Sequence, residues 1–292
     1  MNDVLRFEVE ETLHKIRLED FLFRKFPTLS KMYLREIIKE GKCVIDGNVK
    51  DRGFKLYTGN KIEIELDLSS QTSMMPEDIP LEIVFEDDEI IVVNKPIGML
   101  VHPTKGVRSG TLLNALAFHF NYKQQRNSEE FIRAGLIHRL DKKTSGLIVV
   151  AKNFRALSKV SQHFQRRVVE KRYFARVEGI VAENEGIINA PIGKDEEKRV
   201  WLITESGKQA ESEFKVLERG IDSTLLEMKP VTGRTNQLRL HCVHLGHPII
   251  GDDLYGGREF SRLCLHAYKL EFWHPMTNER LEFETRFPTD FF

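Results

Sequence analysis

The sequence predicts an α+β fold in which a mixed, largely antiparallel sheet forms a large domain and a small α+β domain precedes it. Its 292 residues and 41% hydrophobic content are sufficient for one large core and one small core. Strand-like segments rarely alternate with helical ones, as they would in a doubly wound parallel sheet. Ser, Thr and Pro residues at 67–79 indicate a linker. We therefore expect domains at 1–66 and 80–292.

The first domain is expected to contain two helices followed by strands. Apolar residues recur at helical spacing over 16–26, and the run Pro-Thr-Leu-Ser at 27–30 interrupts them. This run also offers a hydroxyl to cap a second helix, which Gly41 ends. The expected elements are helices at 15–26 and 31–40 and strands at 43–45 and 61–66.

In the large domain, short apolar runs bounded by turn residues predict strands, and apolar residues three or four positions apart predict helices. The expected strands lie at 81–85, 90–93, 147–151, 171–177, 212–217, 224–228 and 281–284. The expected helices lie at 111–120, 154–165 and 236–245.

Composition narrows the classes of function. Three widely spaced cysteines without a Cys-x-x-Cys motif argue against a disulfide framework or a thiolate zinc site. No stretch approaches the roughly 20 apolar residues of a membrane span. The N-terminus lacks the pattern of a signal peptide, so a cytoplasmic protein is expected. Neither a dinucleotide fingerprint nor a phosphate-binding loop is present, and no cofactor is predicted.

The distribution of charge favours a polyanionic partner, although 44 basic and 44 acidic residues give a net charge of zero. Residues 133–176 hold twelve Lys or Arg residues against two acids. Patches of one sign, rather than the total, determine the field that a nucleic acid meets. A solvated helix face would explain such a basic run equally well.

The run His-Arg-Leu-Asp-Lys-Lys-Thr-Ser-Gly at 138–146 places one carboxylate, Asp141, just ahead of an apolar strand. Its basic and hydroxyl side chains are poorly suited to a core, and they suit a site for a nucleotide in RNA. Nearby cations favour the ionised carboxylate. An ionised Asp beside a ribose can attack carbon 1′ or assist departure of the base. Most single Asp residues that neighbour a Lys or Arg form surface salt bridges or helix caps instead.

A second run, Thr-Gly-Arg-Thr-Asn-Gln-Leu-Arg-Leu-His at 232–241, has the same polar and basic character. Together the two runs resemble the signature of the RluA-type pseudouridine synthases, which isomerise uridine within RNA. The resemblance extends from about residue 12 to 288. It implies the fold of that family's catalytic domain and a reaction that requires neither a cofactor nor a metal.

The resemblance also implies three catalytic residues. Asp141 matches the family's essential Asp, and Arg239 matches the basic residue that pairs with it. Tyr173, in Lys-Arg-Tyr-Phe-Ala, matches an aromatic residue that stacks on the flipped uracil or relays a proton at carbon 5. Asn236 departs from the family, which usually has His there. Whether Asp141 forms a covalent adduct or acts as a base on the ribose stays open.

Contacts to RNA are expected from basic residues in both domains. The runs Ser-Lys-x-x-Leu at 30–34 and Gly-Lys-Cys-Val-Ile-Asp-Gly at 41–47 resemble the alpha-L RNA-binding motif of a small ribosomal protein. This resemblance implies large-subunit ribosomal RNA as the substrate. Transfer RNA is the alternative substrate, and a non-catalytic RNA-binding protein of the same fold is the alternative function. A monomer is expected. The RNA-binding residues predicted are Lys31, Arg35 and Lys39 in the first domain and Arg139, Lys142 and Arg234 in the second.

Three histidines at i, i+3 spacing, His241, His244 and His247, could suggest a metal site. Gly246 and Pro248 interrupt the helix before the third histidine could align, and no His-Glu-x-x-His motif is present. No metal site is predicted.

Overall fold

The computed structural model describes residues 3–26, 29, 31–66, 75–104, 106–123, 132–198 and 200–291. It divides the chain into two compact units, Met1–Ile79 with His102–Arg133 and Pro80–Val101 with Ala134–Phe292. Most of the expected linker, residues 67–74, lies outside the described residues. The segment His102–Arg133, which the sequence analysis assigned to the large domain, groups with the first unit.

Specific contacts join His102–Arg133 to the rest of the first unit. The Asn114 side chain donates to the Met75 carbonyl at 2.8 Å. The Arg133 guanidinium donates to the Leu29 carbonyl at 2.8 Å and lies 3.9 Å from the centre of the Phe23 ring. The segment contains α3 (Leu112–Phe118), which a capping box at Thr111 begins, and the short helix η2 (His119–Lys123).

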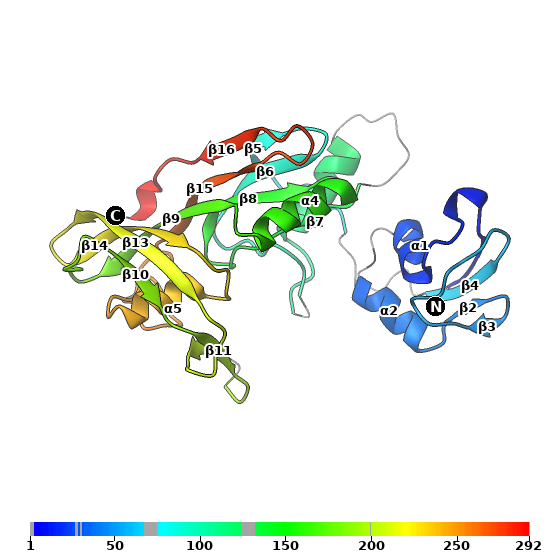
Figure 1. Cartoon of the computed structure of the whole chain (residues 1–292), viewed down its shortest axis with the longest axis horizontal. Coiled ribbons are helices and arrows are strands. Elements are labelled where there is room, and N and C mark those ends of the chain that lie inside the picture. Colours follow the sequence, from blue (N-terminus) through cyan, green and yellow to red (C-terminus); the bar gives the residue numbers. More distant parts are fainter. Residues whose placement is uncertain are drawn as a thin grey trace. The chain divides into compact units, whose positions relative to one another are not determined.

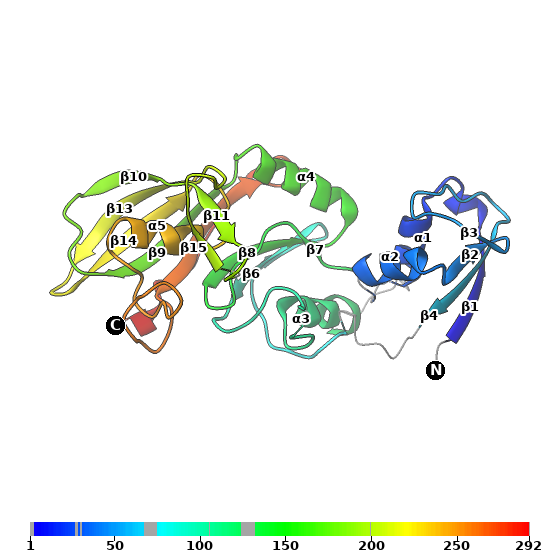
Figure 2. The same ribbon diagram turned by 90° about the horizontal axis from the view of Figure 1, so that it is seen from below.

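The first unit packs two helices against a small antiparallel sheet (Figure 2). The helices are α1 (Leu18–Lys25) and α2 (Lys31–Lys39), preceded by the 3-10 turn η1 (Glu11–Leu13). The sheet order is β1 (Asp3–Glu8), β4 (Lys61–Leu66), β2 (Cys43–Ile45) and β3 (Asn48–Val49). Both expected helices and both expected strands are confirmed, whereas β1 and β3 were not predicted.

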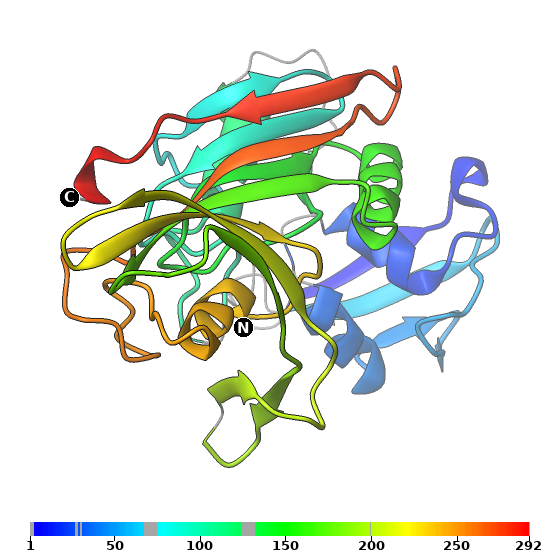
Figure 3. The same ribbon diagram turned by 60° about the vertical axis from the view of Figure 1, so that its left-hand side comes forward.

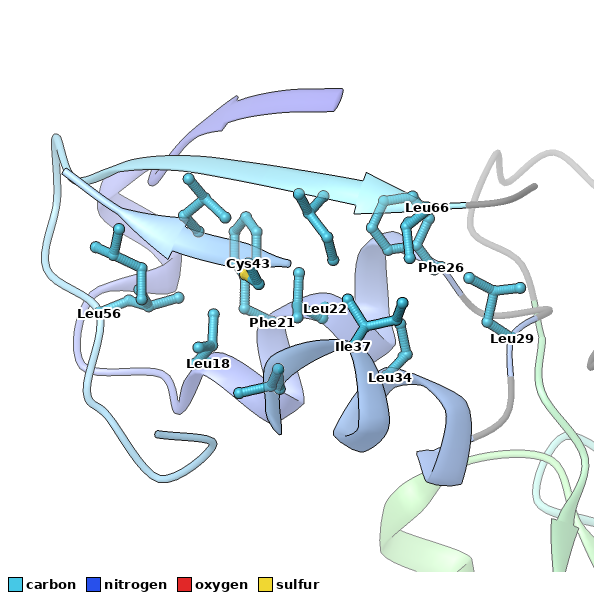
Figure 4. Packing of buried hydrophobic residues seen from close by; sticks show 14 of the residues in the cluster. Leu18, Phe21, Leu22, Phe26, Leu29, Leu34, Ile37, Cys43, Leu56 and Leu66 are labelled. Carbon is cyan, nitrogen blue, oxygen red and sulfur yellow. The ribbon is translucent and has the colours of Figure 1, made fainter. Parts of the chain in front are cut away.

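The core of the first unit explains why these segments fold together (Figure 4). Helical spacing directs Leu18, Phe21 and Leu22 of α1 inward, where they are fully buried. Alternate residues of β4, Ile62 and Ile64, face them from the sheet. Burying each large apolar side chain contributes about 1.5–3 kcal/mol, so this unit has a core of its own.

The second unit is built on one large sheet (Figure 1). Its order is β10 (Glu185–Asn189), β13 (Glu211–Arg219), β14 (Ser223–Pro230), β9 (Glu170–Glu178), β15 (Leu265–Trp273), β8 (Ser145–Ala151), β6 (Ile90–Lys95) and β5 (Glu82–Glu86). In addition, β16 (Arg280–Glu284) pairs with β15, and β7 (Gly135–Leu136) pairs with β8. Among the described strands only β15 and β8 run parallel. The predicted mixed, largely antiparallel sheet is therefore confirmed.

Two helices and a hairpin accompany this sheet. The first helix, α4 (Phe154–Gln165), has the predicted bounds, and Figure 1 shows it alongside β7 and β8. The Asn153 side chain caps α4 by accepting from the Ala156 amide at 2.9 Å. Figure 3 shows α5 (Gln237–His244) beside the curved β14 strand. A separate hairpin, β11 (Ile192–Asp195) and β12 (Val200–Ile203), projects from the sheet, and the 3-10 turn η3 (Thr289–Phe291) lies near the C-terminus.

The strand β15 was not predicted, although it joins β8 to β9 in the middle of the sheet. Its buried polar residues interrupt the apolar pattern from which a strand is predicted. His266 is buried between Ser145 and Thr285, with hydrogen bonds of 2.8 Å to each. Glu271 is buried beside the cations of Lys269 and Arg280. Sequence periodicity cannot anticipate polar residues whose burial depends on partners from distant segments.

Gly146 allows β8 and β15 to approach closely. Its φ is +114°, and a Cβ there would lie 2.2 Å from the Ala267 carbonyl oxygen. The residue lies five positions after Asp141, at the start of the strand that follows the first motif. Gly146 is paired with Ala267, and the backbone at this pair accepts only glycine without a shift.

The three cysteines are free and buried. Burial raises the pKa of the Cys43 thiol to about 12 and that of Cys264 to about 11, and it raises the pKa of Cys242 further. No helix in the described part of the chain is long and apolar enough to cross a membrane.

Candidate active site

A cleft of about 740 Å³ opens in the second unit, where three distant segments of sequence meet. The loop before β8 contributes Asp141, β9 contributes Tyr173, and the start of α5 contributes Arg239. The three residues that the sequence analysis named as catalytic thus line one cleft. Arg139 and Arg234 line it as well.

A buried lysine, Lys95, organises the loop that is hydrogen-bonded to the loop carrying Asp141. Lys95, at the end of β6, has no exposed surface, and its Nζ donates to the carbonyls of Pro96 at 2.8 Å and Met99 at 2.9 Å. The Gly98 amide donates to the Lys142 carbonyl at 2.8 Å, which joins the two loops. Burial lowers the pKa of Lys95 to about 8, against the opposing effect of Asp141. The sequence analysis did not name Lys95, although an Asn-Lys-Pro run at the end of an apolar strand was visible.

Asp141 presents a carboxylate without a hydrogen-bond donor. None of the described residues donates to its oxygens, and its backbone carbonyl accepts from the Thr144 amide at 3.1 Å. Burial raises the pKa of Asp141, and the cations of Arg239, Arg139 and Lys95 oppose that rise. The expectation that nearby cations favour the charged form is correct in sign, but burial outweighs them.

Tyr173 forms part of the cleft wall beside Asp141. It is 9% exposed, and β9 directs it to the face opposite Phe174, which stacks on Tyr268 with ring centres 3.8 Å apart. Burial, and then the negative charge of Asp141, raises the pKa of the Tyr173 phenol. Within the described ranges its hydroxyl has no hydrogen-bond partner, and the residue lines the cleft.

Arg239 forms a bidentate ion pair, but its partner is Asp252 and not Asp141. Its Nε donates to Asp252 Oδ2 at 2.7 Å, and its Nη2 donates to Asp252 Oδ1 at 2.5 Å. Its interaction with Asp141 is electrostatic, without a hydrogen bond. The sequence analysis did not identify this pair.

The polar residues before α5 fix the second motif. The Gln237 side chain accepts from the Thr232 hydroxyl at 2.6 Å and from the Arg234 amide at 3.0 Å. Its Nε2 donates to the Glu211 carbonyl at 2.8 Å. Asn236 has a left-handed backbone, with φ 54° and ψ 21°, a conformation that Asn tolerates better than most residues. Gln237 is therefore a structural organiser that sequence reasoning did not single out.

The residues predicted to contact RNA have different surroundings. Arg139 and Lys142 are exposed, and Arg234 donates from Nε to the Gln209 carbonyl at 3.0 Å. The other three residues belong to α2 in the first unit: Lys31 begins the helix, Lys39 is exposed, and Arg35 pairs with Glu19 at 2.5 Å. Binding of RNA by these six residues remains a prediction.

The three histidines have separate roles. His241 is buried, with hydrogen bonds to Ser212 Oγ at 3.0 Å and the Ala190 carbonyl at 3.2 Å. His247 contacts the Glu178 carbonyl at 2.7 Å. In the described part of the chain no group of three or more His, Cys, Asp or Glu side chains is placed to hold a metal ion.

Comparison with known proteins shows the family to which the chain belongs. Residues 89–244 match the family described as RNA pseudouridylate synthase. The chain is 38% identical over 310 residues to ribosomal large subunit pseudouridine synthase D of Pseudomonas aeruginosa, covering 100% of this chain and 95% of that protein. It is 38% identical over 307 residues to an uncharacterized RNA pseudouridine synthase of Aquifex aeolicus, covering 100% and 96% of the two chains.

Solved structures give the same result. Human RNA pseudouridylate synthase domain containing 1 superposes with a TM-score of 0.60 and 31% identity, covering 72% of this chain and 84% of that one. Human RNA pseudouridylate synthase domain containing 4 superposes with a TM-score of 0.58 and 26% identity, covering 71% and 88%. The chain belongs to the RNA pseudouridylate synthase family and is an enzyme that isomerises uridine in RNA.

Proposed function

We propose that this enzyme converts specific uridines of large-subunit ribosomal RNA into pseudouridine, with Asp141 acting at the ribose. The choice of RNA is supported by the relative from Pseudomonas aeruginosa, whose name specifies the large ribosomal subunit and which matches over the whole chain. A ribosomal substrate would place the protein in the cytoplasm.

The observation that carries the role of Asp141 is that no described residue donates a hydrogen bond to its carboxylate, which lies in a cleft lined by cations. Asp141 is partly exposed and lines the cleft, so its oxygens are open to a ligand. Its free lone pairs can attack carbon 1′ of a flipped uridine or remove a proton from the ribose. Either route breaks the bond from N1 to carbon 1′ and detaches the uracil.

The isomerisation then requires that the detached uracil rotate and reattach. A new bond joins carbon 5 to carbon 1′, carbon 5 loses its proton, and N1 gains one, so the product has the composition of the substrate. The Tyr173 ring lies where it could stack on the uracil, and its hydroxyl has no competing partner in the described residues. We assign Tyr173 to holding the base and to relaying the carbon 5 proton.

Positive charge in the cleft would serve the RNA backbone. Arg139 is exposed at the rim, and Arg239 supplies a fixed cation to the reacting centre. Guanidinium groups bind phosphate oxygens in a planar, two-pronged geometry. The exposed basic residues of α2 would extend this contact from the first unit to the RNA, as in an alpha-L module.

The test is release of tritium from ribosomal RNA labelled at carbon 5 of uridine. We expect release by the wild type and by Asp222→Asn, which alters an exposed Asp paired with Arg258 at the surface. We expect none from Asp141→Asn, which keeps the shape of the side chain but cannot act as a nucleophile or base.

Binding of the same RNA must accompany this assay. Asp141→Asn should bind RNA within about twofold of the wild type, because its loss affects the chemical step and not the phosphate contacts. Release by Asp141→Asn at the wild-type rate would contradict the catalytic role of Asp141. Release from transfer RNA, but not from ribosomal RNA, would contradict the proposed substrate and leave the chemistry intact.

A further inference from the structure

The outer face of α4 carries three cations and no acid. Arg155, Lys159 and Arg166 follow one another at spacings of four and seven residues, so they lie within about 40° of each other around the helix axis. The helix contains no Asp or Glu, and its neighbouring outward residues, Ser158 and Gln162, are exposed and uncharged. We call the three cations, Arg155, Lys159 and Arg166, the basic face of α4.

The basic face of α4 differs from many other cations of the second unit, which lie beside carboxylates. Examples of such pairs are Lys143–Asp253, Lys194–Glu196, Lys229–Glu213, Arg258–Asp222 and Lys269–Glu282. By contrast, Arg155, Lys159 and Arg166 form no ion pair with any residue that the structure describes. An unbalanced patch of one sign is typical of a surface that meets a polyanion, whereas a solvated helix face commonly intersperses both signs.

The electrostatic surroundings of His163 show that the field along this helix is positive. His163 lies one turn from Lys159 and close to Arg166 on α4. Burial, and then the cations of Arg166 and Lys159, lower the pKa of its ring. Among the described residues only cations act on this ring through their charge. The two cations therefore reinforce each other, and no carboxylate cancels them.

The basic face of α4 starts at the catalytic cleft. Gln165, in the last turn of α4, and Arg167, just after the helix, line the same cleft as Asp141. Arg166 lies between these two residues and is exposed, so it is at the rim of the cleft. The other two cations lie about two and three turns farther along the helix, which Figure 1 shows beside β7 and β8. A polyanion that left the cleft over this rim would meet the three charges in succession.

We propose that the basic face of α4 binds the backbone of the RNA segment that leaves the cleft beside the target uridine. Guanidinium and ammonium groups attract phosphate oxygens. The side chains of Ser158 and Gln162 can donate hydrogen bonds to phosphate or 2′-hydroxyl oxygens. Such contacts position the RNA without reading its sequence. The proposal rests on the proposed function, because RNA must occupy the cleft before its flanking segment can reach α4.

The experiment compares two double variants of the full-length enzyme, Lys159→Gln/Arg166→Gln and Lys215→Gln/Arg258→Gln. Lys215 is exposed on β13, Arg258 pairs with Asp222 at the surface, and neither belongs to the described wall of the cleft. Each variant loses two positive charges, so the two differ only in where the charges are lost. The substrate is the shortest fragment of large-subunit ribosomal RNA from which the wild type releases tritium. Single-turnover rates are measured against RNA concentration and salt, together with the melting temperature.

The α4 variant should bind RNA more weakly without reacting more slowly once it is saturated. For Lys159→Gln/Arg166→Gln we expect half-maximal rate at an RNA concentration on the order of tenfold higher, and a slope of log affinity against log salt that is shallower by about 1.4. The saturated rate and the melting temperature should stay at the wild-type values, whereas a packing defect would lower one of them. Lys159→Arg/Arg166→Lys keeps both charges and should keep the wild-type affinity and slope. Equal affinities and slopes for the two charge-removing variants would overturn the proposal.

Shortened RNAs test whether the contact is made by the flanking segment. Nucleotides are removed stepwise from each side of the target uridine. On one side their removal should weaken binding by the wild type, and it should not weaken binding by Lys159→Gln/Arg166→Gln any further, because the same contact is already absent. Losses that multiply in the variant on both sides would assign the flanking RNA to another surface and would overturn the proposal.

The outcome for α4 can be separated from the outcome for the proposed function. Asp141→Asn bears on the chemistry whatever happens at α4. If the wild type releases tritium only from transfer RNA, the ribosomal substrate is contradicted, and the same variants compared on that RNA still decide whether α4 binds it. If neither RNA releases tritium, both the proposed function and the role of α4 are overturned.

Discussion

Replacement of Gly146 by alanine should damage both stability and catalysis, because this glycine lies where β8 pairs closely with Ala267 of β15. An alanine Cβ would lie 2.2 Å from the Ala267 carbonyl oxygen and 2.6 Å from the Ala267 nitrogen. Normal contact requires a separation about 1 Å larger, so one backbone must move by that amount. The φ of +114° adds about 1–3 kcal/mol of backbone strain for a residue with a side chain.

The total cost should reach about 3–5 kcal/mol, the range of severe single substitutions. For a unit of this size that corresponds to a fall in melting temperature of about 10 °C. The displacement also reaches the loop that carries Asp141, and a 1 Å misplacement of reacting groups costs about 100-fold in rate. Gly146→Ala should therefore lose activity even at temperatures where it is folded.

The assay uses urea denaturation followed by tryptophan fluorescence. Both tryptophans, Trp201 and Trp273, belong to the second unit, so the signal reports the unfolding of that unit. Gly233→Ala is the control for stability, because Gly233 belongs to the same unit as the tryptophans and its Cβ would meet nothing within 4 Å. That variant should stay within about 0.5 kcal/mol of the wild type. Equal stability of Gly146→Ala and Gly233→Ala would refute the reasoning.

Two other predictions concern charge. The Arg139 cation opposes the rise that burial causes in the pKa of Asp141. Arg139→Gln should therefore raise that pKa and move the acid limb of the single-turnover rate profile to higher pH, whereas Arg139→Lys should leave the limb in place. Coincident acid limbs for the two variants would disprove this prediction. Lys39→Gln on α2 should make the slope of log affinity against log salt shallower by about 1, because one phosphate contact is lost. Lys61→Gln on β4 of the same unit is the matched control, and equal slopes would exclude Lys39 from the RNA interface.

Local signals predicted much of the fold because local interactions form those elements. The bounds of α4 follow from the Asn153 cap and from apolar spacing that continues to Gln165, and the structure has the same bounds. The strand β8 was recognisable because Leu147–Ala151 is an unbroken apolar run that is buried on both faces. Neither element depends on a partner that the sequence conceals.

The elements that escaped prediction depend on distant partners. In β15, buried polar residues are stabilised by side chains from β8 and from the segment after β16. The strand β1 pairs only with β4, more than fifty residues away, and its own alternation of apolar and charged residues is short.

Part of the candidate site was predicted from the sequence, and the part that depends on distant partners was not. The three residues predicted to be catalytic followed from motif resemblance, and the structure places all three in one cleft. The pairing of Arg239 with Asp252 did not follow, because both Asp141 and Asp252 were eligible carboxylates and sequence contains no distances. The buried Lys95 was missed because a lysine after an apolar strand ordinarily indicates the strand's exposed end.

The alkylation rate of each buried thiol reports local unfolding of the unit that contains it. A cysteine reacts as its thiolate, and burial suppresses that form at Cys43, Cys242 and Cys264 in the folded chain. Alkylation at each position must therefore wait for local unfolding, and its rate measures how often the surrounding core opens. Cys43 belongs to the first unit and the other two belong to the second. Mass spectrometry of the alkylated intact chain can therefore show in which unit RNA binding slows local unfolding, without a truncation.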